Sequence, residues 1–383
     1  MKPGIRVLAC LILTAALWPL QAGAASVPLP SPPTVEARGY LLIDAASGQT
    51  LAEREATQRM EPASITKLMT AYIVFHALSD GRLKLTDEVT ISEHAWRAEG
   101  SRTFVKVGTR VPAEILIKGM IIQSGNDATI ALAEKLGGTE PAFAQMMNEY
   151  AQRLGMNDSH FEDATGLTPM PAHYSTARDI ARLAQAIIRE FPQYYSYYSQ
   201  REFTWNNIRQ ANRNGLLTTD PSVDGIKTGH TEAAGYCLVS SAKRQGTRLI
   251  SVVLGTKNEK AREAASAALL NYGFTFYETV AVKKRGETIL KPRVYKGVVN
   301  DVAVGPATDV AVTVQRGQGA ALTTNVTLQR PLLAPLRTTT AVGELQIRQG
   351  EQVLQRVPLY PLGDVPEAGF FGRMYDAALL MFD

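Results

Sequence analysis

The amino-acid sequence predicts an α+β fold, in which one antiparallel sheet packs with helices and is followed by a small all-β domain and a C-terminal amphipathic helix. Strand-like runs at 40–53 and 235–254 enclose a largely helical middle, which is the pattern of one sheet covered by helices. After about Thr279, short apolar runs alternate with Gly, Pro and Asn, as in all-β domains. We therefore divide the chain into a signal peptide at 1–25, an extended lead-in at 26–35, a main domain at 36–278, a β domain at 279–363 and a terminal helix at 364–383.

The main domain is predicted to begin with a hairpin, since two strand-like runs flank the turn residues Ser47 and Gly48. A helix follows over 64–78, where apolar side chains cover most faces, as in a helix buried through a domain centre. Further helices are expected at 113–122, 128–136, 141–154, 177–190 and 260–272, with strands at 235–241 and 248–254. Candidate strands of the β domain lie at 302–304, 309–314, 321–327, 342–347 and 353–359.

The start of the chain has the organisation of a cleaved export signal. Lys2 and Arg6 precede an apolar run at 7–20, and the small residues at 22–24 supply a cleavage site. An uncleaved anchor is the alternative, but the run is short for a membrane span. Cleavage would leave Cys237 as the only cysteine in an oxidising compartment, so that no intramolecular disulfide could form.

Composition excludes several classes of function. The chain has 383 residues, 40 of them Lys or Arg and 36 Asp or Glu, and this balance does not indicate nucleic-acid binding. The five histidines show no metal-ligand spacing such as His-Glu-x-x-His, which speaks against a zinc peptidase. No Gly-rich phosphate loop or dinucleotide fingerprint is present either, and we expect no cofactor.

The first candidate for chemistry is the pair Ser64 and Lys67. A spacing of three on a helix places both side chains on one face, about one turn apart. A buried lysine favours the neutral amine, which can accept the proton of the serine. Ser and Lys are common, and this spacing alone is weak evidence.

Two further elements each have an ordinary structural interpretation when taken alone. Ser124-Gly125-Asn126 falls between helical stretches, where it is interpreted first as an N-cap. Lys227-Thr228-Gly229 could be a strand edge, although its glycine would let a substrate backbone approach closely.

Together the order Ser-x-x-Lys, Ser-x-Asn and Lys-Thr-Gly matches the motifs of penicillin-binding proteins and β-lactamases, with Gly125 where the lactamase form has Asp. The chain resembles the low-molecular-mass penicillin-binding proteins that are D-alanyl-D-alanine carboxypeptidases with an appended β domain. The stretches at 62–67, 212–217, 223–231 and 370–372 also resemble this subgroup, so that the resemblance covers nearly the whole mature chain. It implies a β-lactamase/transpeptidase-like domain with a helical subdomain.

The resemblance implies an acyl-enzyme cycle that removes the terminal D-Ala from peptidoglycan stem pentapeptides. Ser64 would be the nucleophile, Lys67 the base, and Ser124 a proton relay to the leaving amine. Asn126 would hold the substrate amide, and the backbone N–H groups of Ser64 and His230 would stabilise the oxyanion. The residues implied for the substrate and its carboxylate are Lys227, Thr228, Gly229, Arg213 and Arg262, although both arginines could instead form surface salt bridges.

One departure from the family pattern lies in the loop at 163–169, where Thr165 stands at a position expected to hold histidine. This change could alter deacylation. No carboxylate stands out as the base of a β-lactamase, and penicillins are therefore expected to inhibit by slow-leaving acylation. The alternatives are a D,D-endopeptidase or β-lactamase of the same superfamily, or a non-catalytic cell-wall binding protein.

The last stretch predicts where the protein acts. Residues 370–382 are rich in Phe, Met, Leu and Tyr with a few charges between them, and could form an amphipathic helix on a membrane surface. A helix folded back on the β domain is the alternative. With the export signal, this places the protein in the periplasm, peripheral on the inner-membrane surface.

Overall fold

The computed structural model describes residues 29–381, so the predicted signal peptide lies outside the described residues. A five-stranded antiparallel sheet in the order β2-β1-β9-β8-β7 organises the main domain. Its strands are β1 (Gly39–Asp44), β2 (Thr50–Arg54), β7 (Val223–Thr231), β8 (Gly235–Arg244) and β9 (Thr247–Thr256). Strands from both ends of the domain thus form one sheet, as the sequence predicts.

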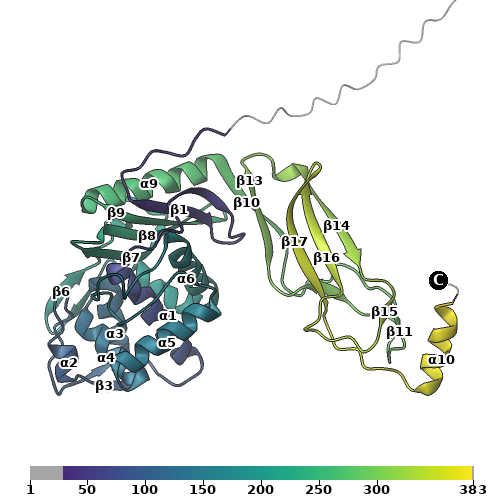
Figure 1. Cartoon of the computed structure of the whole chain (residues 1–383), viewed down its shortest axis with the longest axis horizontal. Helices are drawn as coiled ribbons and strands as arrows, with labels where there is room; N and C mark the ends of the chain where they lie inside the picture. The colour runs from purple at the N-terminus through teal and green to yellow at the C-terminus, as the bar shows by residue number, and fades with distance from the viewer. Residues whose placement is uncertain (1–28, 382–383) are drawn as a thin grey trace, which may run out of the picture. The chain divides into compact units, whose positions relative to one another are not determined.

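The sheet separates two cores because consecutive side chains of a strand point to opposite faces. On β1, Leu42 packs with α9 (Glu259–Phe276), whereas Leu41 and Ile43 belong to the larger core with the remaining long helices. Figure 1 shows α9 on one side of the sheet and the helical layer on the other. The longer helices of this layer are α1 (Lys67–Ser79), α3 (Ala113–Lys118), α4 (Asn126–Gly137), α5 (Glu140–Arg153) and α6 (Ala177–Glu190).

Short elements complete the main domain. They are the 3₁₀ turns η1 (Ala63–Thr66) and η3 (Ser196–Ser199), the π-helical turn η2 (Gly119–Gln123), the helices α2 (Glu93–Trp96), α7 (Pro192–Tyr195) and α8 (Leu216–Thr219), and the strand pairs β3 (Glu88–Thr90) with β4 (Arg110–Pro112) and β5 (Glu202–Trp205) with β6 (Ile208–Ala211).

The C-terminal part is all-β until its last helix, as predicted. Its four-stranded sheet runs β12-β17-β16-β14, and β10 pairs with β13 and β11 with β15. A separate core includes Val304, Ile347 and Leu359. The bounds are β10 (Tyr277–Lys283), β11 (Val294–Tyr295), β12 (Val304–Pro306), β13 (Val310–Gln315), η4 (Gly319–Ala321), β14 (Leu322–Leu328), β15 (Leu332–Leu333), β16 (Gly343–Gln349), β17 (Gln352–Pro361) and α10 (Phe370–Leu379).

The helix expected at 113–122 differs from the structure, because its second half is the π-helical turn η2. The Ser124 N–H bonds the Gly119 carbonyl across five residues, and Ser124 itself adopts the left-handed conformation with φ 65°. A Cβ on Gly119 would lie 2.2 Å from Thr103 Oγ1. The turn therefore packs closely around Thr103, and the helical conformation ends at Ser124.

Candidate active site

Ser64 and Lys67 meet where η1 leads into α1. Lys67 Nζ donates to Ser64 Oγ at 2.9 Å and to the Thr165 carbonyl at 2.9 Å. The lysine is 2 % exposed, whereas Ser64 is half-buried and lines a pocket. Burial lowers the pKa of Lys67 to about 7, with the charge of Asp163 opposing that effect. A neutral amine is therefore accessible near neutral pH within hydrogen-bonding distance of the serine.

Ser124 and Lys227 form a second hydroxyl–amine pair. Lys227 Nζ donates to Ser124 Oγ at 2.9 Å and to the Thr228 carbonyl at 2.9 Å. Burial, followed by the charges of Lys67, Arg213 and Arg262, holds the pKa of Lys227 well below its ordinary value.

The N-cap interpretation of Ser124-Gly125-Asn126 is wrong. Gly125 occupies the cap position of α4, and no side chain accepts a capping hydrogen bond. The glycine is required for space, because a Cβ there would lie 2.0 Å from Thr103 Oγ1. Asn126 Nδ2 donates to the Glu99 carbonyl at 2.6 Å, while its buried Oδ1 has no hydrogen-bond partner within residues 29–381.

Strand β7 carries the third motif at the edge of the sheet. A Cβ on Gly229 would approach the Pro62 carbonyl at 3.0 Å and Ile65 Cγ1 at 3.1 Å, which brings this strand against η1. The ring of His230 packs against that of Tyr236, with centroids 3.9 Å apart and the planes tilted by 31°.

A pocket of about 400 Å³ joins these elements. Eight of the predicted residues line it, and Lys67 and Lys227 lie buried behind two of the eight, each bonded to a serine hydroxyl. The eight are Ser64, Ser124, Asn126, Arg213, Thr228, Gly229, His230 and Arg262. Leu167, from the loop at 163–169, also lines the pocket. Sequence reasoning missed four further lining residues that belong to none of the three motifs: Gly100, Ser101, Tyr236 and Glu259.

Arg262 is not a surface residue, which contradicts the alternative of an exposed salt bridge. Its side chain is 3 % exposed, and its contacts within residues 29–381 are long ones: 3.3 Å to the Arg213 carbonyl, 3.4 Å to Glu259, and 5.7 Å from its guanidinium carbon to the centre of the Tyr236 ring. Its Nε has no hydrogen-bond partner within the described residues. Burial lowers the pKa of this guanidinium. A buried cation with such weak partners, facing a pocket, is suited to binding an anion.

The loop that begins at Asp163 positions the backbone carbonyl that accepts a hydrogen bond from Lys67. The Asp163 carboxylate accepts from the N–H groups of Thr165 at 2.7 Å, Gly166 at 2.6 Å and Thr168 at 2.8 Å. Burial raises the pKa of this carboxyl, but hydrogen bonds from Thr168 and Thr165 and the charge of His173 outweigh it, so that the pKa lies well below its ordinary range. This network fixes the Thr165 carbonyl that contacts Lys67.

The contacts of Thr165 do not explain why threonine stands where histidine is expected. Its hydroxyl donates to Asp163 at 2.7 Å, and the residue is buried. Only its backbone contacts Lys67. An effect of Thr165 on deacylation stays a prediction.

Comparisons with known proteins find matches for both the main domain and the β domain. A family model described as D-alanyl-D-alanine carboxypeptidase matches residues 26–258, and one described as the C-terminal domain of penicillin-binding protein 5 matches 277–367. The D-alanyl-D-alanine carboxypeptidase DacA of Escherichia coli K12 is 42 % identical over 362 residues, which are 92 % of this chain and 90 % of that protein.

Solved structures of penicillin-binding proteins are also similar to this chain. Penicillin-binding protein 5 from Haemophilus influenzae superposes with a TM-score of 0.82 at 40 % identity, covering 88 % of this chain and 100 % of that one. Penicillin-binding protein D2 from Listeria monocytogenes, solved in an ampicillin-bound form, has a TM-score of 0.58 at 29 % identity and covers 63 % of this chain and 100 % of its own.

Proposed function

Because the chain belongs to the D-alanyl-D-alanine carboxypeptidase family, we propose that Ser64 is the nucleophile of this serine-type D-Ala-D-Ala carboxypeptidase. The observation that carries the proposal is the 2.9 Å contact between Ser64 Oγ and a fully buried amine with a pKa of about 7. Neutral Lys67 takes the hydroxyl proton as Oγ attacks the carbonyl of the penultimate D-Ala. The bond to the terminal D-Ala then breaks, and an ester to Ser64 remains.

The leaving amine of D-Ala needs a proton as the bond breaks. Ser124 lines the same pocket as Ser64 and is held by Lys227, so its hydroxyl can pass a proton to that amine and regain one from the lysine side. Water then hydrolyses the ester with Lys67 as the base, which releases the shortened stem peptide and restores Ser64.

We assign substrate alignment to polar groups of the residues that line the pocket. Asn126 Oδ1 is an acceptor without a partner among residues 29–381, and it suits a substrate amide N–H. We assign the oxyanion to the backbone N–H groups of Ser64 and His230, which come from η1 and β7, the two elements that Gly229 lets approach each other.

The terminal carboxylate of the substrate is assigned to the cationic end of the pocket. Arg262 and Arg213 line it, Thr228 adds a hydroxyl, and Lys227 lies behind. Charge-assisted hydrogen bonds from guanidinium groups to a carboxylate are about twice as strong as neutral ones. This explains a preference for cleaving at a free C-terminus.

Replacing Arg262 with glutamine is expected to lower kcat/KM for D-alanine release from a D-Ala-D-Ala peptide by about 10- to 100-fold, since hydrogen bonds to charged groups contribute about 1.5–3 kcal/mol. The same peptide with an amidated C-terminus should lose little further activity in this variant. Arg209→Gln is the matched control, because Arg209 is exposed and paired with Glu202 away from the pocket. Equal losses on the acid and the amide would show that Arg262 does not bind the carboxylate.

The ring carbonyl of a penicillin is the second target that we assign to Ser64. A relative of this chain has been solved with ampicillin bound. A penicillin carries a carboxylate and an amide that match the positions assigned above to Arg262 and Asn126. We propose that penicillins acylate Ser64 and that the ester leaves slowly.

The exposed side chains of α10 support a proposal for where the protein acts. Its Phe371 is 86 % exposed, and Met374, Tyr375 and Met381 are also exposed, whereas Asp376 is buried against the β domain. Asp376 accepts from the Lys296 N–H at 2.5 Å. The helix therefore turns its acidic residue inward and exposes Phe371, Met374 and Tyr375 together with the basic Arg373, a combination of apolar and basic side chains that suits a membrane interface.

No helix within residues 29–381 is both long and apolar enough to span a membrane. We propose that the exported protein is held on the periplasmic face of the cytoplasmic membrane by α10.

The double variant Phe371→Ser/Met374→Ser is expected to reduce co-sedimentation with phospholipid vesicles at least tenfold, because each exposed apolar side chain contributes about 1.5–3 kcal/mol when buried. D-alanine release in solution should be unchanged. Val298→Ser, an exposed apolar residue of the β domain outside α10, is the control. Unchanged vesicle binding by the double variant would refute the role of α10.

A further inference from the structure

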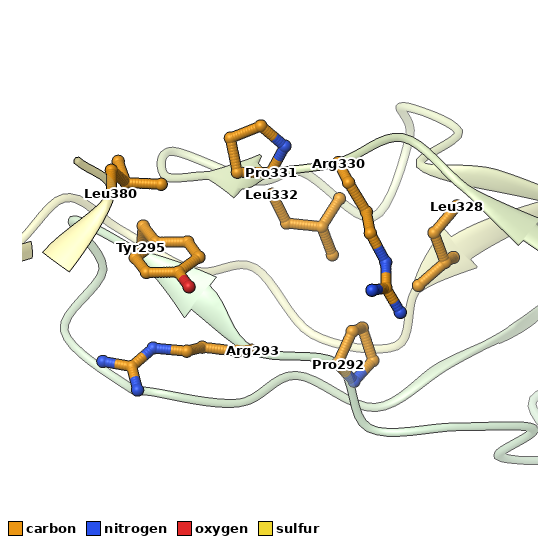
Figure 2. A pocket seen from close by; sticks show the side chains of 8 residues that line it. All are labelled: Pro292, Arg293, Tyr295, Leu328, Arg330, Pro331, Leu332 and Leu380. Atoms are coloured by element: carbon orange, nitrogen blue, oxygen red, sulfur yellow. The ribbon is translucent and has the colours of Figure 1, made fainter. Parts of the chain in front are cut away.

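The β domain holds a second cavity, of about 590 Å³, which plays no part in the proposed reaction. It lies between the segments around β11 and β15, and Leu380 just after α10 closes one side of it (Figure 2). Its size is within the usual range of ligand pockets. Its lining comprises Pro292, Arg293, Tyr295, Leu328, Arg330, Pro331, Leu332 and Leu380.

Two arginines give this otherwise apolar cavity a positive charge. Arg293 is partly neutralised, since its Nη2 lies 3.6 Å from Asp376 Oδ1 and its guanidinium lies 5.0 Å from the centre of the Tyr295 ring. Arg330 is exposed, and within residues 29–381 no hydrogen bond or ion pair engages its guanidinium. Figure 2 shows the Arg330 side chain reaching across the cavity toward Pro292. Arg330 is thus the unpaired cation of the cavity.

Position and chemistry together identify the ligand. The cavity adjoins the end of α10, whose Phe371 and Tyr375 are exposed, and Leu380, the residue directly after α10, lines the cavity. A lipid of the surface on which α10 lies would bring a phosphate to the guanidinium and apolar groups to Leu328 and Leu332. Arginine binds phosphate with two parallel hydrogen bonds.

We propose that this cavity binds the phosphate headgroup of an anionic phospholipid, with Arg330 as its principal contact. This inference rests on the membrane association proposed for α10. It adds a lipid-selective site to an anchor that otherwise depends on apolar burial alone.

The test is co-sedimentation with vesicles of phosphatidylcholine alone and with vesicles containing one-third phosphatidylglycerol, at fixed ionic strength. Wild-type protein should bind the second kind more tightly. Arg330→Gln is expected to remove that preference, a loss of about fivefold or more, as one basic residue near an anionic surface contributes about 1 kcal/mol. Its binding to phosphatidylcholine and its D-alanine release should be unchanged. Arg285→Gln removes the same charge from an exposed residue outside the cavity and should retain most of the preference.

Arg330→Lys distinguishes a built site from diffuse attraction. It keeps the charge but loses the planar fork, and a phosphate site should recover only part of the preference. Full recovery, together with an equal loss in Arg285→Gln, would overturn the site while leaving α10 as an anchor. Failure of the wild type to bind either vesicle would instead refute the membrane proposal. A rise in melting temperature with inorganic phosphate at matched ionic strength, seen in wild type but not in Arg330→Gln, would show a site for a free anion and overturn the lipid assignment.

Discussion

Replacing Ser64 with alanine is expected to abolish D-alanine release, with kcat reduced on the order of 10⁴- to 10⁶-fold, as when the nucleophile of a serine hydrolase is removed. The expected loss is this large because no other group takes the place of Oγ: the ester to the enzyme cannot form. Incubation with penicillin followed by mass spectrometry should show one covalent adduct in the wild type and none in the variant.

The variant should fold normally, since Ser64 is only half-buried and the change removes one oxygen from a pocket wall. Its melting temperature serves as the control. Ser159→Ala is the matched substitution, because Ser159 bonds Ser175 and Asp179 rather than pocket residues. A penicillin adduct that persists in Ser64→Ala would assign the nucleophile to another residue and refute the proposed mechanism.

Local sequence signals predicted most of the fold. The apolar spacing from 177 to 190 predicts a helix with the bounds that α6 has, and Thr176 caps it through its side chain. The strands β3, β4, β5, β6, β10, β11 and β15 were missed. The last two contain only two residues each, Val294–Tyr295 and Leu332–Leu333, which is too short for a periodic pattern.

The pocket was predictable as three motifs but not as a geometry. Ser124 adopts a left-handed conformation that few residues other than glycine take, and the glycines on either side of it, Gly119 and Gly125, both pack against Thr103, which lies about twenty positions earlier in the chain. The packing of the Asp163 loop on η1 is also a long-range effect, since a Cβ on Gly166 would lie 1.9 Å from the Ala63 carbonyl. Such contacts leave no local sequence pattern.

The buried position of Lys67 predicts how the rate should depend on pH. The amine acts as a base only when neutral, and its pKa is about 7. Below that value the lysine is protonated, so kcat/KM should fall about tenfold for each unit of pH, and above it the rate should level off. Glu140→Gln should move this acidic limb of the pH–rate profile to lower pH, because the Glu140 charge raises the pKa of Lys67.

Lys67→Arg tests the assignment most directly, because arginine keeps the positive charge and cannot lose its proton at these pH values. General-base catalysis contributes about 10²- to 10⁴-fold, and we expect a loss of that size in penicillin acylation measured in a single turnover. The limb near pH 7 should vanish with it, a result that mere disturbance of packing would not produce. A variant that is slow but keeps the limb would assign the titrating group elsewhere. Lys227 would then be the next candidate, since burial also lowers its pKa and it contacts Ser124 at 2.9 Å.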